Sequence, residues 1–133
     1  MDTDPTTPKG MRIAGWIITV MVVLFLAMDC GIKLADIAQV KATMMELGYP
    51  ITLDRPIGVI ELICLVLYVY PRTSVLGAVL ETAIMGGAIA SHLRLGDALF
   101  SHTLFGVYLG LMVWAGLWLR DARLRAMIPL RSA

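Results

Sequence analysis

The stretch MRIAGWIITVMVVLFLAMDCGIK, residues 11–33, contains an uninterrupted apolar run from 13 to 28. A helix needs about 20 mostly apolar residues to cross the hydrocarbon core of a bilayer, so this stretch is long enough for a membrane span. Hydrophobic residues make up 59% of the 133-residue chain and charged residues 16%, whereas charged residues make up about 25% of ordinary soluble domains. The composition therefore predicts an integral membrane protein surrounded by the lipid bilayer.

Three further apolar runs follow, of which the first is short for a span. Pro71 should end that run, and Asp97 is expected to cap the last one. None of the runs alternates polar and apolar residues as barrel strands do, and a bilayer offers no water to backbone groups, so we expect helices. The predicted fold class is all-α, an integral membrane four-helix bundle forming a single domain (1–133), with spans at about 12–34, 56–70, 74–93 and 98–119.

The one long segment between spans also has a helical pattern. Ile37, Val40, Met44 and Leu47 recur at steps of three and four, which predicts a short amphipathic helix at about 36–47, lying in the membrane interface. Two interpretations of this helix stay open. It is either a lid over an outer cavity or a linker that rests on lipid headgroups.

The basic residues predict the orientation of the chain, because they gather on the cytoplasmic side of membrane proteins. One side of the predicted bundle holds seven, and the other holds Lys33, Lys41, Arg55 and Arg94. We therefore expect both termini in the cytoplasm, with the basic tail 120–133 either anchoring the chain to lipid or docking a partner. The net charge is only +1 and the basic residues are scattered, which argues against nucleic acid as a partner. The seven basic residues on the predicted cytoplasmic side are Lys9, Arg12, Arg72, Arg120, Arg123, Arg125 and Arg131.

Several short segments, taken in order, carry a resemblance to a known family. From about Arg12 to the arginine-rich tail, the chain resembles the DoxX-like family of small bacterial four-helix membrane proteins. The resemblance implies a bacterial cytoplasmic membrane. It also implies a link to oxidoreductase systems, since the member that gives the family its name is associated with a thiosulfate:quinone oxidoreductase and others with complexes that handle thiol and oxidative stress. The segments are GIKL (31–34), LGYP (47–50), IGVIE (57–61), PRT (71–73), LGA (76–78), GGA (86–88) and HLR (92–94).

Ionisable residues inside the predicted spans are the candidate site. A charge near the bilayer centre costs about 2.5 to 3.5 kcal/mol on insertion scales, so such residues face the bundle interior and find partners. Glu81 and His92 differ by only about 20° around their helix, although they lie about 16 Å apart along it. Asp29 and Lys33 are four residues apart in the order that favours an ion pair. We predict a polar cluster near the outer end of the bundle, with Glu81 deeper, formed by Lys33, Glu61, Glu81, His92 and Arg94, with Asp29 and Arg55 as additional members.

Each member of this cluster has a structural alternative that the sequence leaves open. Lys33, Arg55 and Arg94 also suit interface anchors, His92 suits a helix cap, and the two glutamates suit hydrogen bonds between helices. As a site, an imidazole beside carboxylates would suit proton handling or the headgroup of a quinone, because histidine is the side chain most often used for proton transfer.

Other chemistry is less well supported by the sequence. Cys30 and Cys64 are interpreted as packing residues, with a disulfide as the alternative, and no motif predicts a metal, a catalytic residue or an intrinsic cofactor. We therefore expect a membrane subunit or accessory of a quinone- or thiol-linked oxidoreductase system rather than an independent enzyme. A soluble redox partner and a second copy of the chain stay open as partners. The alternative function is a noncatalytic bundle that binds or transports a small molecule.

Overall fold

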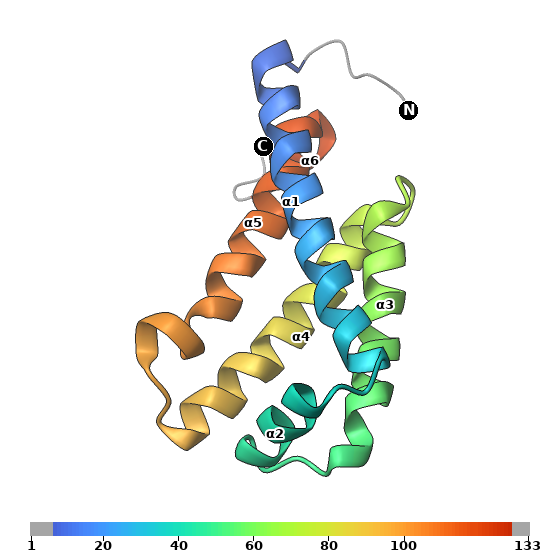
Figure 1. Cartoon of the computed structure of the whole chain (residues 1–133). Helices are drawn as coiled ribbons and strands as arrows, with labels where there is room; N and C mark the ends of the chain where they lie inside the picture. Colours follow the sequence, from blue (N-terminus) through green and yellow to red (C-terminus); the bar gives the residue numbers. More distant parts are fainter. Residues whose placement is uncertain (1–6, 129–133) are drawn as a thin grey trace.

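The computed structural model describes residues 7–128, and every regular element in that range is helical. Four long helices, α1, α3, α4 and α5, lie side by side as a bundle (Figure 1). The prediction of an all-α membrane bundle is confirmed. The elements are α1 (Lys9–Leu34), α2 (Ala38–Glu46), the 3-10 turn η1 (Ile51–Leu53), α3 (Asp54–Val69), α4 (Ser74–Leu95), the π-turn η2 (Leu99–Thr103), α5 (Phe105–Arg120) and α6 (Ala122–Met127).

The four long helices form a closed ring in which each packs against two neighbours. Helix α1 packs on α3 and α5, and α4 packs on the same two helices from the opposite side. The short helix α2 lies at one end of the bundle, here called the α2 end, and α6 lies at the other, here called the α6 end (Figure 1). This ring sets which inward-facing side chains can meet.

Three helical segments within residues 7–128 are long and apolar enough to cross a membrane: Lys9–Leu34, Ser74–Leu95 and Leu99–Arg120. Helix α3 has 16 residues, which at 1.5 Å per residue is about 24 Å, less than the roughly 30 Å of a hydrocarbon core. The second apolar run therefore forms a helix of the bundle, but this helix is too short for its length alone to establish it as a membrane span.

The starts and ends of two helices differ from the sequence-based expectation for local reasons. Asp36 has a positive φ of 57°, which separates α1 from α2, so α2 begins at Ala38. Asp97 was expected to cap the fourth long helix, and this expectation is wrong. Gly96 takes a left-handed conformation (φ 70°) after α4, and the Asp97 carboxylate turns back to His92 instead. The following π-turn has Ala98 at its N-cap, without a side-chain hydrogen bond.

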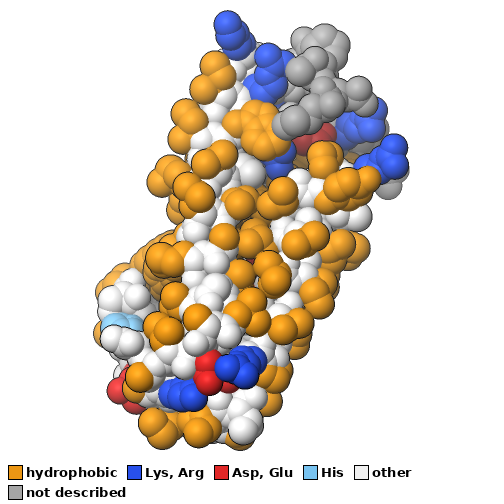
Figure 2. Space-filling view, turned by 45° about the vertical axis from the view of Figure 1, so that its right-hand side comes forward, with side chains coloured by type: hydrophobic (Ala, Val, Ile, Leu, Met, Phe, Trp, Pro, Cys, Tyr) orange, Lys and Arg blue, Asp and Glu red, His pale blue; other side chains and the backbone are white. Residues whose placement is uncertain are grey.

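The outer faces of the helices carry large apolar side chains, which is what a lipid-facing surface requires. Leu24, Phe100 and Leu111 are each more than 60% exposed. Charged side chains gather at the two ends of the molecule, and hydrophobic side chains cover the face between them (Figure 2). Exposed apolar surface on this scale is rare on soluble monomers. The chain is therefore a membrane protein.

Glycines allow the helix backbones to approach closely at specific points. A Cβ atom on Gly77 of α4 would lie 2.2 Å from the backbone nitrogen of Tyr68 in α3. At the contact of α1 with α5, a Cβ on Gly15 would lie 2.9 Å from the carbonyl oxygen of Gly116. Gly86 of α4, in contrast, has no atom within 4 Å of such a Cβ. The contacts at Gly77 and Gly15 set the register of the ring, because no side chain fits between the backbones there.

Gly77→Ala is expected to destabilise the bundle, because the new methyl group must displace the backbone of α3. Overpacking of this kind costs about 1 to 3 kcal/mol, so the thermal unfolding midpoint in detergent should fall by several degrees. Gly86→Ala on the same helix is the matched control. It should leave the midpoint unchanged or raise it, since alanine favours a helix over glycine by about 1 kcal/mol. Equal midpoints for the two variants would contradict the packing described.

Candidate functional site

An ionic network at the α2 end joins α1 to α3. The Lys33 ammonium group donates hydrogen bonds to both carboxylate oxygens of Glu61, at 2.7 and 2.8 Å, and to Asp29 at 2.5 Å. Asp29 and Lys33 lie one turn apart on α1, and Glu61 lies on the inward face of α3. Gly58 lets the two helices meet here, since a Cβ on it would lie only 3.0 Å from the Cβ of Lys33.

The three members of this network differ in exposure. The side chain of Asp29 is 33% exposed, that of Lys33 is 18% exposed and that of Glu61 is 10% exposed. One cation therefore serves two carboxylates, so the network carries a net charge of −1 when all three groups are ionised. All three N–H groups of Lys33 are used inside the network, and Asp29 is the partner that solvent or a ligand reaches most easily.

Glu81 lies deeper in the bundle. It is 1% exposed, and over the part of the chain that the structure describes neither of its carboxyl oxygens has a hydrogen-bond partner. Because Gly77 touches the backbone of Tyr68 and the two helices are antiparallel, Glu81 is level with Cys64. It is therefore about one helical turn further from the α2 end than Glu61.

The other predicted members of the cluster have partners elsewhere. His92 Nδ1 lies 2.6 Å from Asp97 Oδ2, in the turn after α4. Arg94 donates to the carbonyl oxygen of Leu47 at 2.6 Å, and Arg55 pairs with Asp36 at 3.4 Å. The structure thus brings together Asp29, Lys33 and Glu61, and it does not join His92, Arg94 or Arg55 to them.

The segment after α2 is fastened to the end of α4 by contacts that the sequence analysis did not identify. The hydroxyl groups of Tyr49 and Ser91 lie 2.7 Å apart, next to the bond from Arg94 to Leu47. Gly48, with a φ of 75°, makes the turn that allows both contacts. Beside this segment, the pKa of Asp36 is lowered most by its interaction with Asp54 and next by its interaction with Lys41.

A second polar group, also not identified from the sequence, lies toward the α6 end. The Tyr68 side chain is fully buried, and its hydroxyl donates to the carbonyl oxygen of Val113 at 2.9 Å. Tyr68 also interacts electrostatically with Arg120, whose guanidinium lies 4.1 Å from the centroid of the Trp16 ring. Of these residues, the sequence-based prediction used Arg120, as one of the basic residues that orient the chain.

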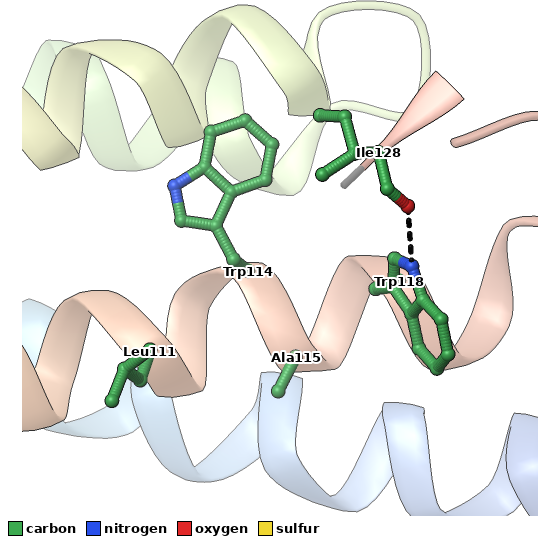
Figure 3. A pocket seen from close by; sticks show the side chains of 5 residues that line it. All are labelled: Leu111, Trp114, Ala115, Trp118 and Ile128. Carbon is green, nitrogen blue, oxygen red and sulfur yellow. Dashed lines mark hydrogen bonds between the residues drawn. The ribbon is translucent and has the colours of Figure 1, made fainter. Parts of the chain in front are cut away.

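Two shallow apolar grooves on the surface are separate from the ionic network. The larger, of about 560 Å³, is lined by residues of α5 together with Ile128, whose carbonyl oxygen accepts a hydrogen bond from Trp118 at 2.9 Å (Figure 3). The smaller, of about 480 Å³, lies between α1 and α3 near Pro71. No member of the network lines either groove. The residues that line the larger groove are Leu111, Trp114, Ala115, Trp118 and Ile128.

Both cysteines are buried free thiols, so the structure has no disulfide between Cys30 and Cys64. Among residues 7–128, no group of three or more histidine, cysteine or acidic side chains is arranged to hold a metal ion.

Comparison with known proteins gives a family match. The DoxX-like family matches residues 17–116, which include most of the four long helices and all three members of the ionic network. No curated protein and no solved structure matches the chain closely enough to serve as a relative.

Lys33→Met is expected to destabilise the bundle strongly, because it leaves the buried Glu61 carboxylate without its cation. Breaking a buried pair in this way costs about 3 to 5 kcal/mol, measurable as a large fall in the thermal unfolding midpoint. Lys41→Met is the matched control and should change little, since the Lys41 pair with Asp36 is more exposed. The double variant Lys33→Met, Glu61→Leu should recover most of the loss. A single variant as stable as the parent would rule out the network as a structural tie.

Proposed function

The chain belongs to the DoxX-like family, and from that premise we propose that it is a membrane subunit or accessory of a quinone- or thiol-linked oxidoreductase system. The observation that carries this proposal is the position of Lys33 between Asp29 and Glu61. Ionisable residues inside a membrane bundle are costly, and they mark ligand or proton sites far more often than soluble ion pairs do. The proposed role of the network is to bind the polar part of a redox substrate or to contact a soluble redox partner.

The donor chemistry of the network fits a quinone headgroup. A quinone, when bound, accepts two electrons and two protons, and its carbonyl oxygens accept hydrogen bonds. Lys33 is the donor that suits such an oxygen, and because its N–H groups are all in use, a headgroup would have to replace one carboxylate. Asp29 is the more exposed of the two and the easier one to displace.

We also propose that the α6 end faces the cytoplasm of a bacterial cell, with both termini on that side. Support comes from the charge distribution, since Lys9, Arg12, Arg72 and Arg120 lie on or next to the ends of helices that meet there. Arg123 and Arg125 of α6 add to the same end. Arg131 and the last part of the basic tail, 129–133, lie outside the described residues.

A second candidate function is a noncatalytic bundle that binds or transports a small molecule. The observation that favours it is the groove lined by Trp114 and Trp118, whose surface is apolar and carries no titratable side chain (Figure 3). Such a groove suits a small apolar ligand without a redox step.

The experiment purifies the protein with its native lipids, identifies co-eluting proteins and quinones, and repeats this with Glu61→Gln. Because Glu61 holds Lys33 in position, removing the carboxylate charge should reduce the bound quinone or partner about tenfold or more, since a hydrogen bond from the charged Lys33 to the ligand contributes about 1.5 to 3 kcal/mol. His92→Ala and the exposed Glu46→Gln are the controls. Both should keep the ligand, because His92 pairs with Asp97 and Glu46 lies outside the bundle core.

Retention of every partner and quinone by Glu61→Gln would overturn the proposed site. A molecule that is lost from Trp114→Leu but kept by Glu61→Gln would favour the second candidate function.

A further inference from the structure

Glu81 is the one acid among residues 7–128 whose two carboxyl oxygens are both buried and both without a hydrogen-bond partner. It lies inside α4, and the nearest ionic contact made by that helix, between His92 and Asp97, is three helical turns further along it. Hydrogen bonding between helices, the structural role that the sequence left open, is therefore not what holds it in place.

Titratable side chains extend from the ionic network past Glu81 through the interior of the bundle. On α3, Glu61, Cys64 and Tyr68 recur at steps of three and four residues and are all buried. Cys64 and Tyr68 both interact electrostatically with Glu81, and Tyr68 in turn interacts with Arg120 near the α6 end. Toward the α2 end, Glu61 lies about one helical turn beyond the level of Glu81, and its side chain is 10% exposed.

The charges around Glu81 do not compensate a negative charge on it. Asp29 and Lys33 on α1 and Glu61, Cys64 and Tyr68 on α3 interact with it electrostatically, and Arg120 of α5 interacts with Tyr68. Lys33 is already shared by two carboxylates, so the ionised network has a net charge of −1. A carboxylate buried in apolar surroundings without a partner is very costly, and the neutral acid avoids that cost.

We propose that Glu81 is a proton-binding site in the interior of the membrane, and that it exchanges its proton with solvent at the α2 end through Glu61. In the exchange, the O–H bond of the Glu81 acid breaks as its proton passes to a water molecule that enters the bundle, and that water donates a proton to form a new O–H bond on a carboxylate oxygen of Glu61. Glu81 then holds the negative charge, and the proton leaves Glu61 for water at the more exposed side of the network. The reverse steps reload Glu81. No oxidant or reductant takes part, so this inference does not rest on the proposed function.

The test is infrared spectroscopy of the full chain in lipid bilayers without quinone, in H₂O and D₂O at neutral pH. The parent should show the carbonyl stretching band of a protonated carboxyl group, and this band should shift when the proton is replaced by deuterium. Glu81→Gln should lack the band, and Glu46→Gln should keep it. A parent without the band, or a band that Glu81→Gln retains, would overturn the proposal.

The route through Glu61 is tested by the rate of deuterium exchange at the same band. Glu61→Gln should keep the band but exchange at least about tenfold more slowly than the parent, since an amide cannot take up the proton. The control His92→Ala, on the same helix as Glu81, should exchange at the parent rate. An unchanged rate in Glu61→Gln would show that the proton leaves by another path. This outcome is distinct from loss of quinone in the same variant, which reports on the proposed function.

Glu81→Leu provides a second measurement in case the amide variant does not fold. Because Glu81 makes no hydrogen bond that leucine would remove, the thermal unfolding midpoint at neutral pH should be unchanged or higher. A fall of several degrees would mean that the carboxyl group contributes structural bonds, and it would overturn a role as a free proton-binding site.

Discussion

Hydrocarbon does not solvate charge, and the arrangement of this molecule follows from that constraint. The outer faces of the four long helices are apolar, so each ionisable side chain within the bundle either reaches an end or turns inward. At the α2 end, Lys33 binds two carboxylates and so compensates part of their negative charge. Glu81, deeper in the bundle, has no such partner. The difference between these two acids, one paired and one unpaired, is the main chemical feature of the interior.

Backbone packing determines which polar groups meet. Gly58 allows α3 to lie against α1 so that Glu61 reaches Lys33, and Gly77 sets α4 against Tyr68 so that Glu81 faces Cys64. Because lipid is as apolar as the side chains it meets, hydrophobicity gives membrane helices little reason to associate, and close contact at small residues takes its place. The same glycines that close the ring therefore position the candidate site, and its geometry depends on contacts made by residues without chemistry of their own.

The sequence predicted the features that depend on local pattern. Apolar run length gave the long helices, and the four-residue spacing of Asp29 and Lys33 gave their ion pair. Helical periodicity placed Glu81 and His92 on one face, but it did not predict that Gly96 would turn the chain so that Asp97 meets His92. Contacts such as Tyr49 with Ser91 join residues 42 positions apart. They depend on which helices are neighbours and at what height, which no pattern within a single helix contains.

A carboxyl group at the position of Glu81 is not explained by the stability of the fold. The surrounding core consists of apolar side chains such as Leu65, Met85 and Leu109, and an apolar residue would pack among them without the cost of burying two unpartnered oxygens. The network of Lys33 differs in this respect, since each of its groups satisfies another and ties α1 to α3. Stability therefore accounts for the paired acid at the α2 end, whereas the unpaired acid calls for a chemical role. Holding a proton is the role that leaves a buried carboxyl group neutral.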